Sequence, residues 1–386
     1  MKSVGIITID KCNNYGAELQ AYALVQVLQW MKYDAEIIDY LYFKNPKHRA
    51  CAMSRPIRSQ SLKERISCWL KYRFATKILY NMAPLISKKL RLRNKRFDSF
   101  HRLNTKMSPT YCSMKDLYNG VKKYDVYVVG SDQVWNPYTE SNLAPYFLQF
   151  APSDAKKMSY ASSFGVTEIP PFAQPLFRQW IMGLQYVSCR ETAGIEIVKK
   201  LSGKDAVLTL DPTLLLNKEQ WLSVEGCEIT MPPQYVLVYA VKGAPAKLLE
   251  MAKLYSERHN IPIYSICTQA IGNIAIDGVI NVEDAGPADF VHMFANATIV
   301  LTNSFHGTAF SCNLGKMFYS VLSKSSKKNS RMTNLLANIG LSDRIIWDDD
   351  DNPFDSDKMY DVDSVQKLLS IERQKSIEYL ITSIES

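Results

Sequence analysis

Short apolar strands alternate with amphipathic helical stretches along most of this chain, and this alternation limits its fold more than any other feature. The first strand is predicted at 3–8 and is followed by a loop at 9–15, a helix at 16–31 and a strand at 35–39. Further strands are predicted at 125–129, 158–162, 186–189 and 206–210. Strands that alternate with helices in this way form a mostly parallel sheet covered by helices.

A second series follows a segment with three glycine or proline residues at 225–233. Its strands are predicted at 235–239, 263–266, 279–282, 298–301 and 317–321, with helices at 245–258 and 287–295. A length of 386 residues, 47% of them hydrophobic, is enough for two domains with full cores. We therefore expect an α/β protein with two Rossmann-like domains facing a cleft, at 1–224 and 225–361. A last helix at 362–386 is expected to pack back on the first domain.

The cysteines and the apolar runs indicate the cellular compartment of the protein. The eight cysteines include no CxxC pair and no grouping with histidine at zinc-like spacing, so we expect reduced thiols, no metal and no cofactor. The first strand comes too early for a signal peptide, and no apolar run approaches the roughly 20 residues of a spanning helix. These features predict a cytoplasmic protein.

Positive charge is concentrated in one block at 44–102, which holds 17 Lys and Arg against Glu64 and Asp98, whereas the whole chain carries a net charge of +8. The block is predicted to be a helical insertion in the first domain. Its apolar residues fall at helical spacing: Leu62, Ile66, Trp69, Leu70, Phe74 and Ile78. This stripe either packs on its own domain or lies on an anionic membrane. No motif for nucleic acid accompanies the charge, so nucleic acid is not an expected partner.

One histidine stands where a strand breaks into a helix. His306 lies among the polar residues Asn303, Ser304 and Thr308, and a helix is predicted from about 307 to 314. The free N–H groups and positive dipole end of a helix N-terminus favour an anion. An acid–base group beside an anion site suggests chemistry on a phosphorylated or carboxylated substrate, although a histidine in such a turn can also be structural.

Two loops of the first domain carry groups that suit a sugar. Asn14, Tyr15 and Gly16 open the first helix, and Ser131, Asp132, Gln133 and Trp135 follow a strand. Carboxylates and amides bind hydroxyls, and an aromatic face stacks on the C–H surface of a sugar ring. The alternatives are that Asn14 only caps the helix and that Trp135 belongs to the core.

Two arginines, one at the end of a predicted strand and one at the start of a predicted helix, stand in positions that suit the binding of an anion. Arg190 ends a strand, where it can hold a carboxylate or phosphate with two parallel bonds, or else form a local ion pair. Ser330 and Arg331 open a predicted helix in the second domain.

Taken in order, these loops resemble the polysaccharide pyruvyl transferase family. The features that match are Asn14-Tyr15-Gly16 with Leu19-Gln20, the loop 130–135, Arg190-Glu191, Asp211-Pro212-Thr213, the segment 303–307 and Ser330-Arg331. The resemblance implies a GT-B-like fold and an enzyme that transfers the enolpyruvyl group of phosphoenolpyruvate onto two hydroxyls of one sugar, forming a pyruvate ketal. It also implies that Arg190 and His306 act in donor binding or catalysis. One departure is that many relatives have an arginine where this chain has Ser304.

The resemblance leads to a full set of expected roles. His306 and Arg190 are the expected catalytic residues, Asn303, Ser304, Thr308, Ser330 and Arg331 bind the donor, and the residues named at 14–16 and 131–135 bind the acceptor. The expected acceptor is a lipid-diphosphate-linked glycan precursor of bacterial surface polysaccharide, with a galactose-type sugar, at the cytoplasmic face of the inner membrane. The alternatives are a GT-B glycosyltransferase that uses a nucleotide sugar and a non-catalytic glycan-binding protein.

Overall fold

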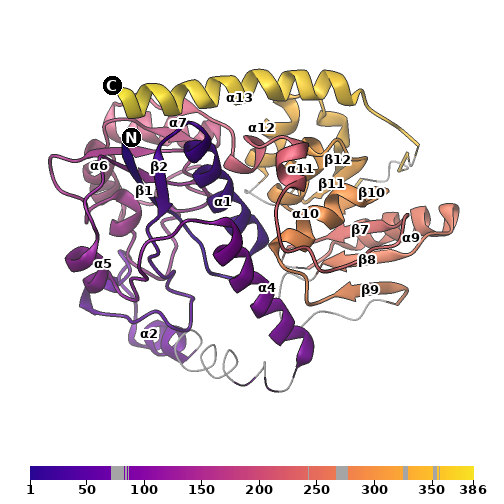
Figure 1. Cartoon of the computed structure of the whole chain (residues 1–386), viewed down its shortest axis with the longest axis horizontal. Coiled ribbons are helices and arrows are strands. Elements are labelled where there is room, and N and C mark those ends of the chain that lie inside the picture. Colours follow the sequence, from indigo (N-terminus) through magenta and orange to yellow (C-terminus); the bar gives the residue numbers. More distant parts are fainter. Residues whose placement is uncertain are drawn as a thin grey trace. The chain divides into compact units, whose positions relative to one another are not determined.

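Two units, each with its own parallel sheet, make up the chain (Figure 1). This computed structural model describes residues 1–386 except 71–81, 83–84, 86, 242, 267–276, 325–328, 351–353 and 356. The first unit consists of Met1–Lys88, Thr105–Leu215 and Gln374–Ser386, and the second of Lys89–Asn104 and Leu216–Arg373. The prediction of two Rossmann-like α/β domains is confirmed by the two sheets.

The first unit contains a four-stranded parallel sheet of order β2-β1-β3-β4. Its strands are β1 (Ser3–Ile7), β2 (Asp34–Ile37), β3 (Val126–Val129) and β4 (Lys156–Ser159). A separate parallel pair is formed by β5 (Ser188–Cys189) and β6 (Val207–Leu208). Because β2 and β3 lie on opposite sides of β1, the strand order reverses between β1 and β3. In open α/β sheets ligands bind at such a reversal, beyond the carboxyl ends of the strands.

Helices of the first unit cover an aromatic core: α1 (Tyr15–Trp30), α5 (Met114–Gly120), α6 (Gln174–Met182) and α7 (Thr192–Ser202). The helix α2 (Leu62–Trp69), in the basic block, buries none of its residues. Short 3₁₀ helices occur at Ala52–Ser54, Ala144–Phe147 and Pro212–Leu214. In the core the indole of Trp135 stacks on Phe147, with ring centroids 5.0 Å apart and planes 5° apart. All four residues of β3 are buried, which is typical of a parallel strand covered on both faces.

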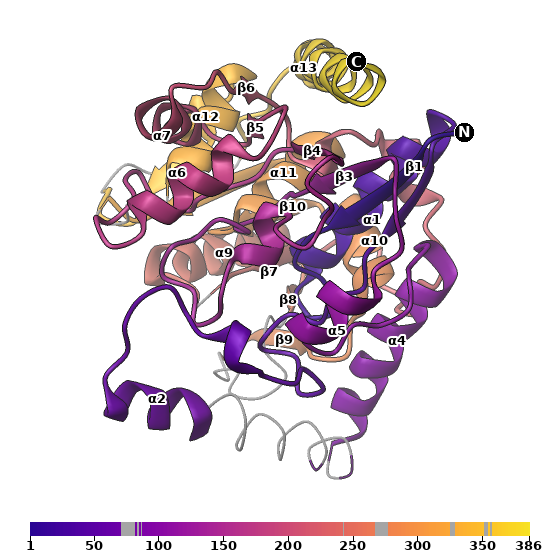
Figure 2. The same ribbon diagram turned by 90° about the vertical axis from the view of Figure 1, so that its left-hand side faces the viewer.

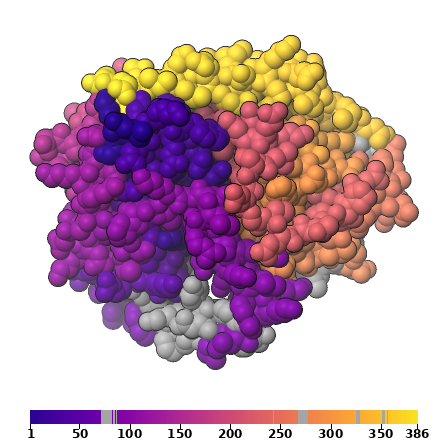
Figure 3. Space-filling view, in the orientation of Figure 1, coloured from indigo at the N-terminus to yellow at the C-terminus, as the bar shows by residue number. Residues whose placement is uncertain are grey.

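The end of the chain completes the first unit. Residues 374–386 form the last part of the helix α13 (Val362–Glu385). Here Tyr379 donates a hydrogen bond to the carbonyl of Ser159 at 2.9 Å, and the ammonium group of Lys2 donates to the carbonyl of Ile384 at 2.9 Å. Figure 3 shows the indigo N-terminus beside the yellow C-terminus. The last turns of α13 are thus tied to Ser159 of β4 and to Lys2, the residue before β1.

The second unit is a six-stranded, fully parallel sheet of order β12-β11-β10-β7-β8-β9. The strands are β7 (Val236–Tyr239), β8 (Ile263–Ile266), β9 (Val279–Val282), β10 (Ile299–Thr302), β11 (Phe318–Leu322) and β12 (Ile345–Trp347). The helices are α8 (Lys218–Leu222), α9 (Ala246–His259), α10 (Pro287–Asn296), α11 (Phe305–Asn313) and α12 (Ser330–Asn338), with a 3₁₀ turn at Ser342–Arg344. From the centre of the sheet, β7, β8 and β9 follow one another to one edge, and β10, β11 and β12 follow one another to the other edge. This is the doubly wound Rossmann order.

The helix α4 (Lys88–Asn104) differs from expectation, because residues 89–104, which include the last part of the basic block, belong to the second unit. Arg96 explains this placement. Its guanidinium, 10% exposed, pairs with Asp284 at 2.9 Å, Glu228 at 3.2 Å and Asp289 at 3.6 Å. A charge held in so little water needs carboxylate partners, and all three are in the second unit. A side chain at Gly286 would come 2.6 Å from the Cβ of Arg96, so α4 lies close to this turn.

The division between the units also falls earlier than the expected 224/225, at 215/216. Trp221 on α8 is fully buried and contacts Phe310 on α11, with ring centroids 4.8 Å apart. This contact explains why α8 belongs to the second unit. Among the helices that the structure describes, none combines the length and apolar character that a bilayer-spanning segment needs.

Candidate functional site

The reversal point of the second unit lies between β7 and β10, and Asn303 joins the loops that follow these strands. Its side-chain oxygen accepts a hydrogen bond from the backbone N–H of Val241 at 2.7 Å, and its amide nitrogen donates to the carbonyl of Gly243 at 3.0 Å. Asn303 therefore holds together the two loops whose divergence creates a ligand site in folds of this kind.

The helix α11 begins at Phe305, two residues earlier than predicted, so that His306 lies in its first turn. Ser304 is the N-cap, and its hydroxyl accepts a hydrogen bond from the N–H of Gly307 at 3.5 Å. Thr308 donates to the carbonyl of Ser304 at 3.1 Å and shares a hydrogen bond of 2.7 Å with Ser320. The hydroxyls of Ser304 and Thr308 thus hold the start of the helix in place.

Gly307 allows α11 to start this close to β10. A Cβ at this position would lie 2.2 Å from the hydroxyl oxygen and 2.9 Å from the Cβ of Thr302, the last residue of β10. Thr302 itself is fixed, because its hydroxyl donates to the carbonyl of Tyr239 at 2.6 Å. Only glycine fits between the helix and this hydroxyl.

Phe305 is in contact with the side chains of His306 and Arg331. The ring of His306 lies at 80° to that of Phe305, with centroids 5.3 Å apart. The guanidinium of Arg331, in the first turn of α12 behind Ser330, lies 5.6 Å from the centroid of the same ring. His306 is buried, with 9% of its surface exposed. The structure therefore brings together a histidine, an arginine and a helix N-terminus, the groups that were expected to bind an anion.

The reversal point of the first unit lies between β1 and β3 and is closed by Gln20 from α1. Its amide nitrogen donates to the hydroxyl of Thr8 at 2.9 Å, and its oxygen accepts from the N–H of Ser131 at 2.9 Å. Thr8 in turn donates to the carbonyl of Ser131 at 3.1 Å. Gln20 was noted only as part of the family pattern, and the structure shows that it positions the loop that carries Asp132.

Arg190 is buried in the first unit between two carboxylates. Its guanidinium bonds Asp211 at 2.6 Å and Asp132 at 3.3 Å, and its side chain is 1% exposed. Burial lowers the pKa of this guanidinium, but the carboxylates of Asp211, Asp132 and Glu191 outweigh burial and raise the pKa above its ordinary value. Asp211 also accepts from the hydroxyl of Ser131 at 3.2 Å. The geometry thus shows Arg190 in local ion pairs, with Asp132 and Asp211 as partners.

Carboxylates dominate the loop that follows β1. The pKa of the Cys12 thiol is raised by burial and by the charges of Glu18, Asp132 and Asp10. Glu18 accepts hydrogen bonds from the backbone N–H groups of Lys11 at 3.2 Å and Cys12 at 3.0 Å, which fixes the loop. This end of the sheet is rich in hydrogen-bond acceptors, and it suits a ligand with hydroxyl groups better than an anion.

The other residues expected to bind a sugar are only partly accessible. Asn14 is exposed and caps α1, accepting from the N–H of Ala17 at 3.2 Å, whereas Tyr15 and Gly16 are buried in the first turn. Trp135 is fully buried and its indole N–H donates to the carbonyl of Tyr146 at 2.7 Å. In this structure the indole supports the loop from within and does not present a face to a sugar. Asp132 and Gln133 remain half-buried.

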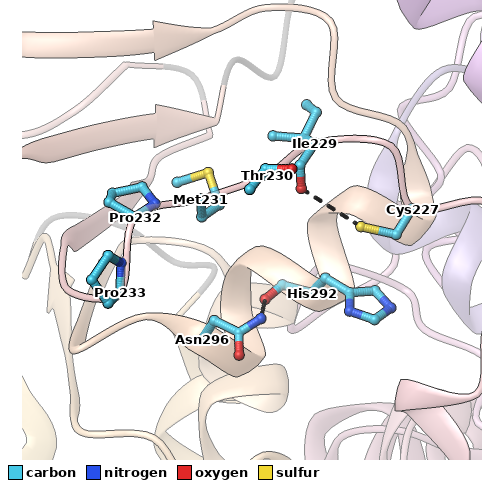
Figure 4. Close-up of a pocket in the computed structure, with 8 residues that line it drawn as sticks. All are labelled: Cys227, Ile229, Thr230, Met231, Pro232, Pro233, His292 and Asn296. Carbon is cyan, nitrogen blue, oxygen red and sulfur yellow. Dashed lines mark hydrogen bonds between the residues drawn. The ribbon is translucent and has the colours of Figure 1, made fainter.

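A separate hollow of about 410 Å³ lies in the second unit, and its lining includes none of the residues expected at the site (Figure 4). Its lining comes from the segment before β7 and from α10: Cys227, Ile229, Thr230, Met231, Pro232, Pro233, His292 and Asn296. Within the residues that the structure describes, no group of three His, Cys, Asp or Glu side chains is arranged to hold a metal ion.

Together, two doubly wound parallel sheets with polar side chains at both reversal points define an α/β protein of the two-domain Rossmann class. The chain belongs to the polysaccharide pyruvyl transferase family, whose model matches residues 14–325. This match includes most of both units and supports the prediction of a transferase of pyruvyl groups in polysaccharide biosynthesis. No curated protein matches the chain.

Among solved structures, the chain is similar to a proposed UDP-N-acetylglucosamine 2-epimerase from Listeria monocytogenes, with a TM-score of 0.47 and 11% identity over 98% of this chain and 89% of that one. It is also similar to UDP-GlcNAc 2-epimerase from Methanocaldococcus jannaschii, with a TM-score of 0.45 and 11% identity over 96% of this chain and 92% of that one. Neither structure is close enough to indicate a ligand or an activity for this chain.

Proposed function

We propose that this protein transfers the enolpyruvyl group of phosphoenolpyruvate onto two hydroxyls of one sugar and so forms a cyclic pyruvate ketal. The family match supports the transfer of a pyruvyl group to a glycan. The observation that carries the choice of donor is the contact of Phe305 with both His306 and Arg331 at the start of α11. This region offers an acid–base group, a fixed cation and a helix N-terminus to a donor that carries a phosphate and a carboxylate.

The proposed roles on the donor side follow from these contacts. Arg331 neutralises part of the donor's negative charge, and a charge-assisted bond to an arginine is stronger than a neutral one. Asn303, Ser304, Thr308 and Ser330 shape the loops and helix starts that receive the donor. His306 either protonates C3 of phosphoenolpyruvate or stabilises the departing phosphate.

The reaction that we propose needs no reagent besides phosphoenolpyruvate and the sugar. A proton is added to C3 of phosphoenolpyruvate, and one sugar hydroxyl attacks the oxocarbenium-like C2 and gives up its proton. The bond between C2 and the phosphate oxygen then breaks, and its electron pair leaves with the phosphate. The second hydroxyl attacks C2 and loses its proton, which closes the ketal. A positioned general acid contributes roughly 10² to 10⁴ in rate to such a sequence.

The acceptor sugar is proposed to bind at the first unit, where Asp132, Gln133 and Asn14 offer oxygen acceptors to its hydroxyls. Asp132 can also take the proton that a hydroxyl releases. Arg190 pairs with both Asp132 and Asp211, so we propose that it contributes chiefly by keeping the Asp132 carboxylate in place. We further propose that the acceptor is a galactose-type residue on a lipid-diphosphate-linked precursor of bacterial surface polysaccharide, and that the reaction takes place at the cytoplasmic face of the inner membrane.

The decisive experiment incubates the purified protein with phosphoenolpyruvate and a panel of glycosides. It follows phosphate release together with a gain of about 70 Da in the acceptor, the increment for C₃H₂O₂ in a ketal. Both signals should appear with the same glycoside. Turnover of a nucleotide sugar in place of phosphoenolpyruvate would instead indicate a glycosyltransferase, and glycoside binding with no turnover of any donor would indicate a glycan-binding protein.

A further inference from the structure

The helix α2 exposes an apolar stripe. Leu62 is 70% exposed, Ile66 50%, Trp69 56% and Leu70 47%. Their spacing of four, three and one residues places all four side chains on one side of the helix. α2 has no buried residue. These four side chains are therefore largely exposed, whereas Phe74 and Ile78, the other two residues of the predicted stripe, lie outside the described residues.

The helix itself is well defined at its start. The hydroxyl of Ser61 accepts from the N–H of Glu64 at 3.3 Å, and the carboxylate of Glu64 accepts from the N–H of Ser61 at 2.8 Å. This reciprocal pair is a capping box, which satisfies two backbone donors at once. Arg58 forms an ion pair with Glu64. The helix that carries the exposed stripe therefore has a well-defined N-terminus.

The polar side of α2 faces the first unit. The thiol of Cys68 lies 3.8 Å from the carboxylate of Glu140, also in the first unit. Cys68 follows Glu64 by one helical turn, so both lie on the side away from the stripe. Figure 2 shows α2 at the margin of the first unit, apart from its sheet. The contact turns the polar side inward and leaves the apolar side outward.

Basic residues border the stripe on both sides. At 100° per residue, Lys63 falls beyond Leu70 on one edge and Arg65 beyond Trp69 on the other. The whole block 44–102 carries 17 Lys and Arg against two acids. A short apolar face bordered by bases, with a tryptophan among its apolar residues, is the pattern of a helix that lies in the interface of an anionic bilayer.

We propose that α2 docks the protein on an anionic membrane, with Leu62, Ile66, Trp69 and Leu70 inserted at the boundary between headgroups and acyl chains. Lys63 and Arg65 then meet the lipid phosphates. Charge complementarity favours lipid over a second copy of the chain, because a symmetric pair of α2 helices would bring the same basic edges together. The docking does not depend on which reaction the protein catalyses.

The test uses the full-length protein and flotation with vesicles of phosphatidylcholine, with or without phosphatidylglycerol, in the absence of any substrate. The wild type should float with the anionic vesicles and much less with the neutral ones. Ile66→Ser/Trp69→Ser and Lys63→Glu/Arg65→Glu should each reduce the bound fraction about tenfold or more. The side chains are exposed, so both variants should unfold at the temperature of the wild type.

A matched control is Leu254→Ser/Ile371→Ser, which removes two other helical side chains of similar exposure, 51% and 53%. It should float like the wild type. Absence of flotation by the wild type, or an equal loss in this control, would overturn the proposal. It would also be overturned if analytical ultracentrifugation showed a dimer that Ile66→Ser/Trp69→Ser dissociates. Because no substrate is present, a negative result here leaves the test of pyruvyl transfer unaffected.

Discussion

The guanidinium of Arg331 lies 5.6 Å from the centroid of the Phe305 ring, directly beside the first turn that carries His306. The family resemblance predicts an arginine at the position of Ser304, and in this chain that residue is a helix cap instead. Arg331, from the different helix α12, places a positive charge beside the start of α11. The aromatic face of Phe305 is one of the contacts that hold this cation in place.

Replacing Arg331 should weaken donor binding. We expect Arg331→Ala to raise the KM for phosphoenolpyruvate about 10- to 100-fold, which corresponds to the loss of one hydrogen bond between charged groups. Arg331→Lys should recover only part of this loss, since an ammonium group lacks the planar fork. Lys324→Ala, which removes a cation paired with Asp349 on the surface of the same unit, serves as the control. An unchanged KM in Arg331→Ala would remove this residue from the donor site.

Replacing His306 should affect turnover far more than folding. We expect His306→Ala to lose roughly 10² to 10⁴ in kcat while circular dichroism stays that of the wild type. The solvent deuterium isotope effect on kcat, compared between the wild type and His306→Ala, distinguishes the two proposed roles. Loss of the acid that protonates C3 should make this proton transfer more strongly rate-limiting and raise the effect, whereas loss of a phosphate stabiliser should not. Turnover within a few-fold of the wild type would show that His306 is structural.

Gly307→Ala should displace the start of α11. The added methyl group would lie 2.2 Å from the hydroxyl of Thr302, which is itself hydrogen bonded, so the helix must move away. Overpacking of this kind typically costs about 1–3 kcal/mol. We expect a lower free energy of unfolding in urea together with a loss of activity. Gly120→Ala, where the methyl group meets only the edge of the Tyr111 ring at 3.3 Å, should be milder.

The ion pairs of Arg190 should contribute unequally to stability. Asp211 is fully buried and 2.6 Å from the guanidinium, whereas Asp132 is 3.3 Å away with 17% of its side chain exposed. Removing one partner of a buried pair costs about 3–5 kcal/mol. We therefore expect Asp211→Ala to lower the free energy of unfolding by about this amount and Asp132→Ala by clearly less. Equal effects in urea denaturation would contradict the structure.

Thiol reactivity should follow the two opposite pKa shifts in the first unit. Burial tends to raise the pKa of the Cys51 thiol, but hydrogen bonds from Ser54 and neighbouring backbone groups outweigh it and lower the pKa. The pKa of Cys12 is raised. Near neutral pH more of Cys51 is therefore thiolate, and iodoacetamide should modify it before Cys12. Peptide mass mapping at several pH values checks the order, and Ser54→Ala should slow the labelling of Cys51.

The order of strands and the residues at their ends could be predicted from the sequence because both depend on local pattern. Runs such as 298–301 and 235–239 are short and apolar, and they form neighbouring buried strands. His306 was identified because it follows such a strand. Its position inside the first helical turn was missed, since the cap formed by Ser304 starts the helix two residues earlier than the apolar pattern indicates.

Partners that are distant in sequence could not be predicted. Arg190 follows a strand as expected, but nothing local indicates that Asp132 and Asp211 surround its guanidinium. The sequence around Trp135 is the same whether its indole faces a ligand or the core. Only the stacking on Phe147 in the structure shows that the indole belongs to the core. The attachment of α4 to the second unit depends on carboxylates almost 200 residues further along the chain, at Asp284 and Asp289.

The assignment of residues 89–104 and 374–386 means that the chain passes between the two units four times. No single cut in the sequence releases either unit whole, and neither can be produced as one uninterrupted fragment. During synthesis the strand β1 is made first, yet Lys2 finds its partner Ile384 only when the intervening residues have been made. Contacts of such sequence separation slow folding. The first unit is therefore complete only when residues 374–386 have been made, and a truncation that removes them should impair a sheet whose strands lie more than 200 residues earlier.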